Sequence, residues 1–138
     1  MPGLRCYLAL LLAWAPLAQA DAIRLQQADG SELHLAEPAR RIITLAPHLA
    51  EGVFAAGAGR KLVATVEFSE YPAAATDLPR IGDAFRLDLE RILAFGPDLV
   101  LAWDSGNPRR AVDQLRELGI TTWSIEIRDP HEIPAFID

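Results

Sequence analysis

The stretch Arg41-Ile-Ile-Thr-Leu-Ala-Pro-His48 decides the fold of this chain, because a short apolar run passes directly into a helix start. The β-branched run over residues 41–45 is typical of a buried strand. Pro47 suits the first turn of a helix, where its missing N–H costs no hydrogen bond. Apolar residues at helical spacing continue this helix to a glycine that favours its end: Leu49, Val53, Phe54 and Gly57.

The alternation of strand and helix repeats downstream. We predict further strands over residues 62–66, 98–102 and 121–127, with one helix capped by Asp88 and the next capped by Asn107 between them. Short strands that alternate with helices predict an α/β fold, a three-layer lobe whose parallel sheet is covered on both faces. The apolar stripes of the two helices are Leu89, Ile92 and Leu93 in the first and Val112, Leu115 and Leu118 in the second, which Gly119 ends.

Residues 21–39 precede this lobe and predict a β-hairpin. Asp29-Gly30 supplies a turn that tolerates positive φ between two alternating strands. We assign residues 40–138 to the α/β lobe and expect residues 68–86 to form a long connection within it. The apolar positions of the hairpin are Ile23, Leu25, Leu33 and Leu35.

The first 20 residues predict a cleaved signal peptide. Arg5 precedes an apolar run of roughly 13 residues, which is shorter than the ~20 that a membrane span needs. Ala18-Gln19-Ala20 matches the small residues of a cleavage site, so we expect secretion with cleavage after Ala20. Cys6 is the only cysteine and is removed with the signal, so we expect no disulfide.

The chain is acidic, with 13 basic residues against 19 acidic ones and a formal net charge of −6. This balance argues against nucleic acid or an anionic membrane as a partner. A last helix is predicted to begin at Asp129-Pro130, and the sequence stops at Asp138 before that helix finishes. We therefore expect a fragment or an early stop.

Common catalytic and cofactor motifs fail in this sequence. Residues 57–61 (Gly-Ala-Gly-Arg-Lys) place Arg60 where a phosphate-binding loop needs glycine before its lysine. No Gly-x-Ser-x-Gly motif occurs, and the histidines His34, His48 and His131 lack metal-ligand spacing. We therefore expect no catalytic residues, no metal site and no cofactor.

Aromatic residues follow the predicted strands at their carboxyl ends, where ligands bind on parallel sheets. Each of them is either part of a surface for a large flat ligand or ordinary core filling, and Trp123, inside a strand, is assigned to the core. His48 lies at the start of its helix, either as a ligand contact or as a simple cap. The candidate substrate-binding residues are Trp103, Phe68, Tyr71, Phe85, His48 and Asn107.

Several motifs occur in an order that resembles the helical-backbone (class III) periplasmic binding proteins, which serve ABC importers of iron-siderophores, heme and cobalamin. The motifs are residues 41–51, Ser69-Glu-Tyr-Pro72, Leu78-Pro-Arg-Ile-Gly82, Leu89-Glu-Arg-Ile92 with Pro97-Asp-Leu-Val100, and residues 114–120. Residues 102–107 (Ala-Trp-Asp-Ser-Gly-Asn) and 112–115 are most similar to the cobalamin-binding members.

The resemblance implies two α/β lobes joined by a long helix, of which this chain holds the N-terminal one. It implies capture of a corrinoid and delivery to permease subunits. Trp103 resembles a cobalamin-contacting tryptophan, and Phe68 stands in place of a contacting tyrosine. A second such tryptophan is replaced by Ala84, with Phe85 beside it, which leaves heme and siderophores open as ligands.

Glu90 resembles the surface glutamate that docks an arginine pocket of the permease. Its position in the first turn of a helix is equally explained by the helix dipole. Two further alternatives stay open: an envelope α/β enzyme, and a fragment without function of its own.

Overall fold

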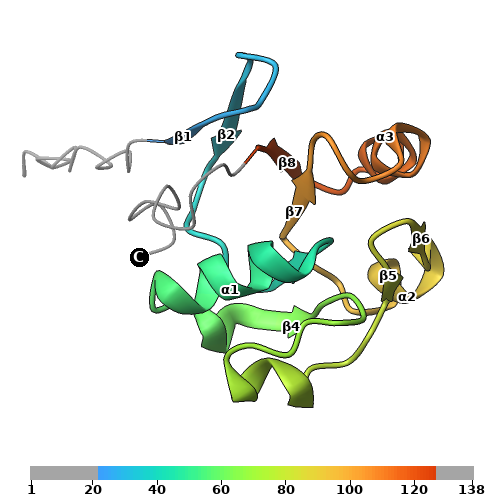
Figure 1. The fold of residues 1–138 in the computed structure, drawn as a ribbon. Coiled ribbons are helices and arrows are strands. Elements are labelled where there is room, and N and C mark those ends of the chain that lie inside the picture. Colours follow the sequence, from blue (N-terminus) through green and yellow to red (C-terminus); the bar gives the residue numbers. More distant parts are fainter. Residues whose placement is uncertain (1–21, 127–138) are drawn as a thin grey trace, which may run out of the picture.

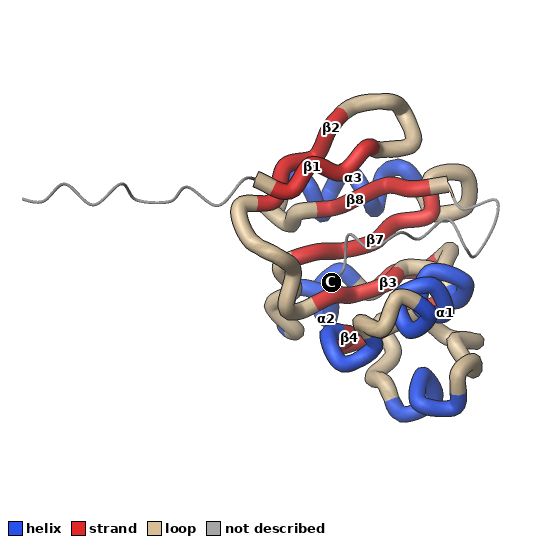
Figure 2. Tube along the Cα trace, turned by 90° about the vertical axis from the view of Figure 1, so that its left-hand side faces the viewer, coloured by secondary structure: helices blue, strands red, loops and turns tan. Residues whose placement is uncertain are grey.

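Four parallel strands form the central sheet in the order β4-β3-β7-β8 (Figure 1 and Figure 2). The computed structural model describes residues 22–126, so the predicted signal peptide, the last helix and His131 lie outside the described residues. The strands confirm the four predicted ones: β3 (Ile42–Thr44), β4 (Leu62–Ala64), β7 (Leu99–Trp103) and β8 (Thr122–Ile125).

The strand order reverses beside β3. The chain passes from β3 through helix α1 (Pro47–Ala55) to β4 on one side, and later enters β7 on the other side. The pairs Thr44↔Leu101 and Trp103↔Ile125 set the parallel register. The carboxyl ends of β3 and β7 therefore flank the switch point where open parallel sheets form a ligand crevice.

Both faces of the sheet are covered, as predicted. Side chains that alternate along a strand point to opposite faces, so Ile42 packs in the cluster that contains α1 and Ile43 in the other. The second cluster is closed by α2 (Leu89–Ala94) and α3 (Arg109–Glu117). Figure 2 shows α1 and α3 on opposite sides of the sheet.

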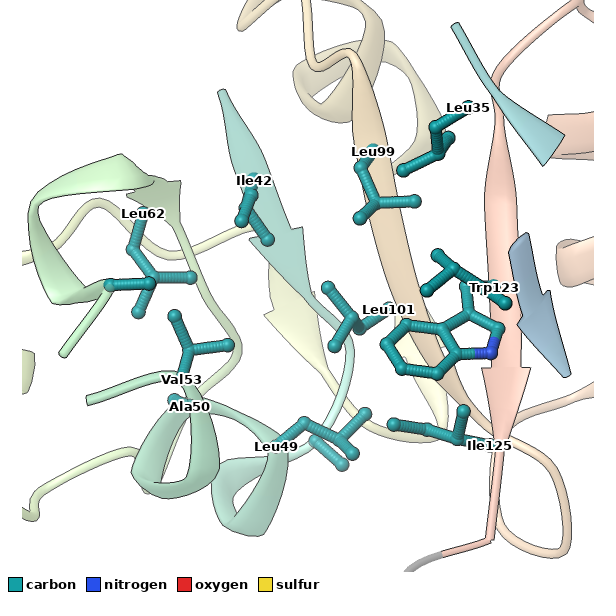
Figure 3. Packing of buried hydrophobic residues seen from close by; sticks show 13 residues of the cluster. Leu35, Ile42, Leu49, Ala50, Val53, Leu62, Leu99, Leu101, Trp123 and Ile125 are labelled. Carbon is teal, nitrogen blue, oxygen red and sulfur yellow. The ribbon is translucent and has the colours of Figure 1, made fainter. Parts of the chain in front are cut away.

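The core of the α1 face is built from aliphatic side chains and one indole. Figure 3 shows Leu49 of α1 near Leu101 and Trp123 of the sheet, and Val53 of α1 near Leu62. Trp123 is 5% exposed, which confirms its assignment to the core.

The predicted hairpin consists of β1 (Ile23–Gln26) and β2 (Glu32–Leu35), paired antiparallel. Gly30 takes a φ of 85°, as its turn requires. The hairpin lies beside β8 (Figure 2), where the Ala28 amide donates to the Ser124 carbonyl at 2.9 Å. The Trp123 indole N–H donates to the Gln26 carbonyl at 2.9 Å. These bonds cover an otherwise open sheet edge.

The predicted long connection after β4 contains short regular elements. It contains the 3₁₀ helix η2 (Ala73–Asp77) and a small antiparallel pair, β5 (Gly82–Asp83) and β6 (Arg86–Leu87). The Arg80 guanidinium donates to the carbonyls of Ala75 and Ser69 at 3.1 and 2.9 Å. These bonds join residues that local spacing does not connect, which is why the sequence pattern did not reveal them. A shorter 3₁₀ helix, η1 (Gly59–Lys61), precedes β4.

Three details of the predicted helices are wrong. Pro108, rather than Asn107, is the N-cap of α3, because the Asn107 amide is drawn into the interior. Leu118 is 55% exposed because α3 ends before it, and Leu93 is 39% exposed because the six-residue α2 turns a single face to the sheet. Gly119 takes a φ of 83°, which confirms the predicted end of α3.

Among the described residues, no helix is long and apolar enough to cross a membrane.

Candidate functional site

His48 and Trp103 meet at the point where the strand order reverses. His48 lies in the first turn of α1, after β3, and Trp103 is the last residue of β7. Their rings are in contact edge to face, with centroids 5.1 Å apart and planes at 86°. Both side chains are half-buried, so each keeps a surface open to solvent.

Contacts with other residues also hold the Trp103 ring in place. Its indole N–H donates to Oε1 of Glu126 at 3.4 Å, and Oε2 of the same carboxylate accepts from the Ser105 amide at 3.1 Å. The indole also lies against Gly106, where a Cβ would stand 2.0 Å from the ring. Glycine is therefore required there for the ring to keep its place.

Glu126 was missed by the sequence analysis. We predicted the last strand over residues 121–127, whereas β8 ends at Ile125. The apolar side chain at position 127 extended the predicted strand past its end. Glu126, the first residue after β8, thereby went unnoticed.

The buried side chain of Asn107 connects three segments at the carboxyl edge of the sheet. Its Oδ1 accepts from the Trp103 amide at 2.6 Å, and its Nδ2 donates to the carbonyls of Leu45 and Ala84, each at 2.8 Å. Asn107 is 5% exposed. Its polar atoms are used within the fold, which favours a role in positioning neighbouring residues over direct contact with a ligand.

Phe68, Tyr71 and Phe85 point into solvent, with exposed fractions of 76%, 71% and 67%. Core filling does not explain side chains this exposed. Phe68 also has a φ of 68°, a conformation that costs a non-glycine residue free energy and is concentrated at functional sites.

Buried hydroxyl groups fix the segment that carries Phe68. The Thr65 hydroxyl lies 2.8 Å from that of Thr44 at the end of β3, and 3.0 Å from that of Ser69. All three residues are buried. Phe68 is thus exposed between neighbours that are anchored to the carboxyl edge of the sheet.

Phe85 lies at the tip of the β5–β6 turn. The Asp83 carboxylate accepts from the amides of Phe85 and Arg86, both at 2.8 Å, and closes the turn. Ala84 is 8% exposed, and its carbonyl accepts from Asn107. The turn is therefore tied to the same asparagine that holds Trp103.

The segments around the strand ends carry more carboxylates than cations. The pKa of His48 lies below its ordinary value mainly because burial disfavours the imidazolium, and Glu126 and Glu51 oppose this shift only in part. Arg80 is turned toward Glu67, with Nε 4.0 Å from the carboxylate. The carboxylates in these segments are Glu51, Glu67, Glu70, Asp83, Asp104, Asp113 and Glu126, and the arginines besides Arg80 are Arg86, Arg109, Arg110 and Arg116.

Trp103 and Asn107 also line a cavity of about 40 Å³ beside α3. This volume is little more than that of one water molecule. This cavity is therefore too small to hold a large ligand. Within residues 22–126, no cluster of three or more metal-ligating side chains occurs.

Glu90 lies exposed in the first turn of α2, beside Asp88, whose carboxylate caps the helix by accepting from the Arg91 amide at 3.1 Å. The residues that the structure describes give Glu90 no ion pair. Its carboxylate is available to an outside partner, and it complements the helix dipole in either case.

The sequence matches no family model. The vitamin B12-binding protein of Vibrio cholerae (strain O395) is 46% identical over 101 residues, which are 73% of this chain and 37% of that protein. The chain therefore spans about a third of the length of the curated relatives that it matches.

Two solved structures share the fold. The periplasmic vitamin B12 binding protein BtuF of Vibrio cholerae aligns with a TM-score of 0.61 and 48% identity, over 63% of this chain and 34% of that one. The periplasmic heme-binding protein RhuT from Roseiflexus sp. RS-1 aligns with a TM-score of 0.58 and 32% identity, over 63% and 33%.

The parallel sheet and its aromatic carboxyl edge define a lobe of a periplasmic binding protein. Within that class, the chain belongs to the family that contains these vitamin B12-binding and heme-binding proteins. The predicted fold class and family are thereby confirmed.

Proposed function

We propose that this chain is the N-terminal lobe of the substrate-binding component of an ABC importer, and that it captures cobalamin. The observation that carries the proposal is the aromatic surface at the switch point of the sheet. Trp103 is held there by defined contacts, while Phe68, Tyr71 and Phe85 are exposed.

Such a surface suits a large, flat, delocalised ligand. Aromatic faces bury much area while losing little side-chain entropy, and a corrin ring offers an extended partner for them. His48 lies at the border of this aromatic surface. Its imidazole is neutral at pH 7, since burial lowers its pKa. A neutral imidazole can accept or donate a hydrogen bond to the amide groups that surround a corrin ring.

The charge at the edge favours cobalamin over heme. Cobalamin carries amide side chains, whereas the carboxylates of heme need cations to pair with when they are taken from water. Carboxylates outnumber arginines at this edge. The relatives named for vitamin B12 are also more similar in sequence, at 46% and 48% identity against 32% for the heme-binding structure.

Heme is the second candidate within the family. It is favoured by the similarity to the heme-binding structure and by His48, whose imidazole is a ligand that iron accepts. The position of His48 argues against heme, because its ring packs edge to face against Trp103.

Location and delivery follow from the same proposal. The protein would reach the periplasm through cleavage after Ala20, and Glu90 would dock an arginine pocket of the permease. The protein would act by binding and release, without catalysis. The two solved structures support this role because their names describe periplasmic binding proteins.

The test is a titration of the chain with cyanocobalamin and, separately, with hemin, followed by tryptophan fluorescence and calorimetry. We expect one cyanocobalamin to bind per chain and to quench Trp103. Phe68→Ala is expected to weaken binding, whereas Leu118→Ala, which removes another exposed apolar side chain from a different part of the surface, leaves binding unchanged. Response to hemin alone moves the assignment to heme, and no response to millimolar amounts of either ligand overturns the proposal.

A further inference from the structure

Glu126 bridges two groups that determine how Trp103 lies. One carboxylate oxygen accepts the indole N–H of Trp103 at 3.4 Å, and the other accepts the backbone N–H of Ser105 at 3.1 Å. Ser105 belongs to the turn that leaves β7, so a single carboxylate connects the Trp103 ring to the backbone beside it. Hydrogen bonds to a charged acceptor are stronger than those between neutral groups.

The sheet brings Glu126 to this place. Trp103 pairs with Ile125 in the parallel register of β7 and β8, so the residue that follows β8 emerges beside the end of β7. Glu126 is partly buried, which reduces the competition from water for its carboxylate.

The contacts of Trp103 lie on different sides of its ring. Gly106 lies close against the ring, His48 meets it edge to face at 5.1 Å, and Glu126 receives its N–H. Gly106 lies against the six-membered part of the indole, and Glu126 receives the N–H of the five-membered part. Rotation of the indole by half a turn about its side-chain bond would remove the N–H from Glu126, because the N–H lies on one edge of the ring only.

We propose that Glu126 is a positioning residue for Trp103 and holds its indole in the orientation that receives a flat ligand. The inference rests on the proposed function for the identity of that ligand, but the positioning itself is independent of any ligand. Glu126 acts through Trp103 and through the turn at Ser105, and needs no contact with the ligand.

The experiment follows the indole N–H resonances of the ¹⁵N-labelled chain without ligand, with the Trp103 signal assigned from Trp103→Phe. In Glu126→Ala, we expect the Trp103 signal to shift and its exchange with water to accelerate by about tenfold. Glu126→Gln keeps one acceptor oxygen and is expected to restore the signal in part. Glu117→Gln, an exposed change at the end of α3, leaves it in place.

A Trp103 signal in Glu126→Ala that matches the unaltered chain, in shift and in exchange rate, overturns the proposal. Thermal unfolding of each variant shows that the fold is retained, and the Trp123 signal serves as an internal reference for the core. An altered Trp103 signal with unchanged affinity for cyanocobalamin confirms the positioning and instead contradicts the proposed function, since Trp103 would then not receive the ligand.

Discussion

His48 and Trp103, which lie far apart in the sequence, touch edge to face with ring centroids 5.1 Å apart. The contact joins the ends of β3 and β7, the two neighbouring strands between which the strand order reverses. It links the titrating imidazole to the ring that we propose as the ligand platform. Both the stability and the binding of the protein are therefore expected to depend on this pair.

The stability of the protein is expected to fall as the pH drops below about 6.5, the ordinary pKa of histidine. Burial lowers the pKa of His48 in the folded protein. Between the two pKa values the unfolded chain therefore binds a proton that the folded chain does not, and folding loses free energy until the lower pKa is passed.

Urea unfolding at about pH 7.5 and at about pH 5.5 measures this loss. In His48→Gln and His48→Phe, the difference between the two midpoints should shrink. If both variants keep the difference of the unaltered chain, burial of His48 is not its source.

Phe68→Gly is expected to stabilise the protein while weakening ligand binding. Glycine adopts the φ of 68° without strain, which we expect to add about 1 kcal/mol to the free energy of unfolding. Little packing is lost because the ring is 76% exposed. Phe68→Ala serves as the control, since it removes the ring and keeps the backbone strain. A loss of stability in the glycine variant, measured by urea unfolding, would contradict this account.

Gly106→Ala is expected to displace the Trp103 ring, because the added Cβ would stand 2.0 Å from it. The emission spectrum of Trp103 should shift, and the affinity for cyanocobalamin should fall. Gly119→Ala is the matched control. It meets open space at a φ of 83°, so we expect a loss of about 1 kcal/mol in stability and no change at Trp103. Equal effects of the two variants on binding would rule out a specific role for Gly106.

Asn107→Ala is expected to destabilise the protein by about 3 kcal/mol, since it leaves the buried carbonyls of Leu45 and Ala84 without their donor. Asn107→Asp should cost more, because a carboxylate would face those two carbonyls. Gln114→Ala, an exposed change on α3, should cost less than about 0.5 kcal/mol. Urea unfolding compares the three, and a small effect at Asn107 would mean that water replaces its amide.

The strands and helices were predictable where the signal was local. The buried run over residues 41–45 and the cap at Asp88 depend on neighbours within one turn or one strand, and both appear in the structure. The prediction failed where hydrogen bonds between residues distant in sequence determine the local structure. Arg80 orders the connection after β4, and Asn107 leaves its expected capping position for partners in three different segments.

The sequence alone determined the α/β class, the hairpin, the buried Trp123 and the family, because hydrophobic periodicity, caps and motifs are written in consecutive residues. Only the tertiary structure brought Glu126, Gly106 and His48 around Trp103 and exposed Phe68, Tyr71 and Phe85 to solvent. These placements depend on the register between β7 and β8 and on the order of the strands, which arise when the sheet assembles and distant segments pack together.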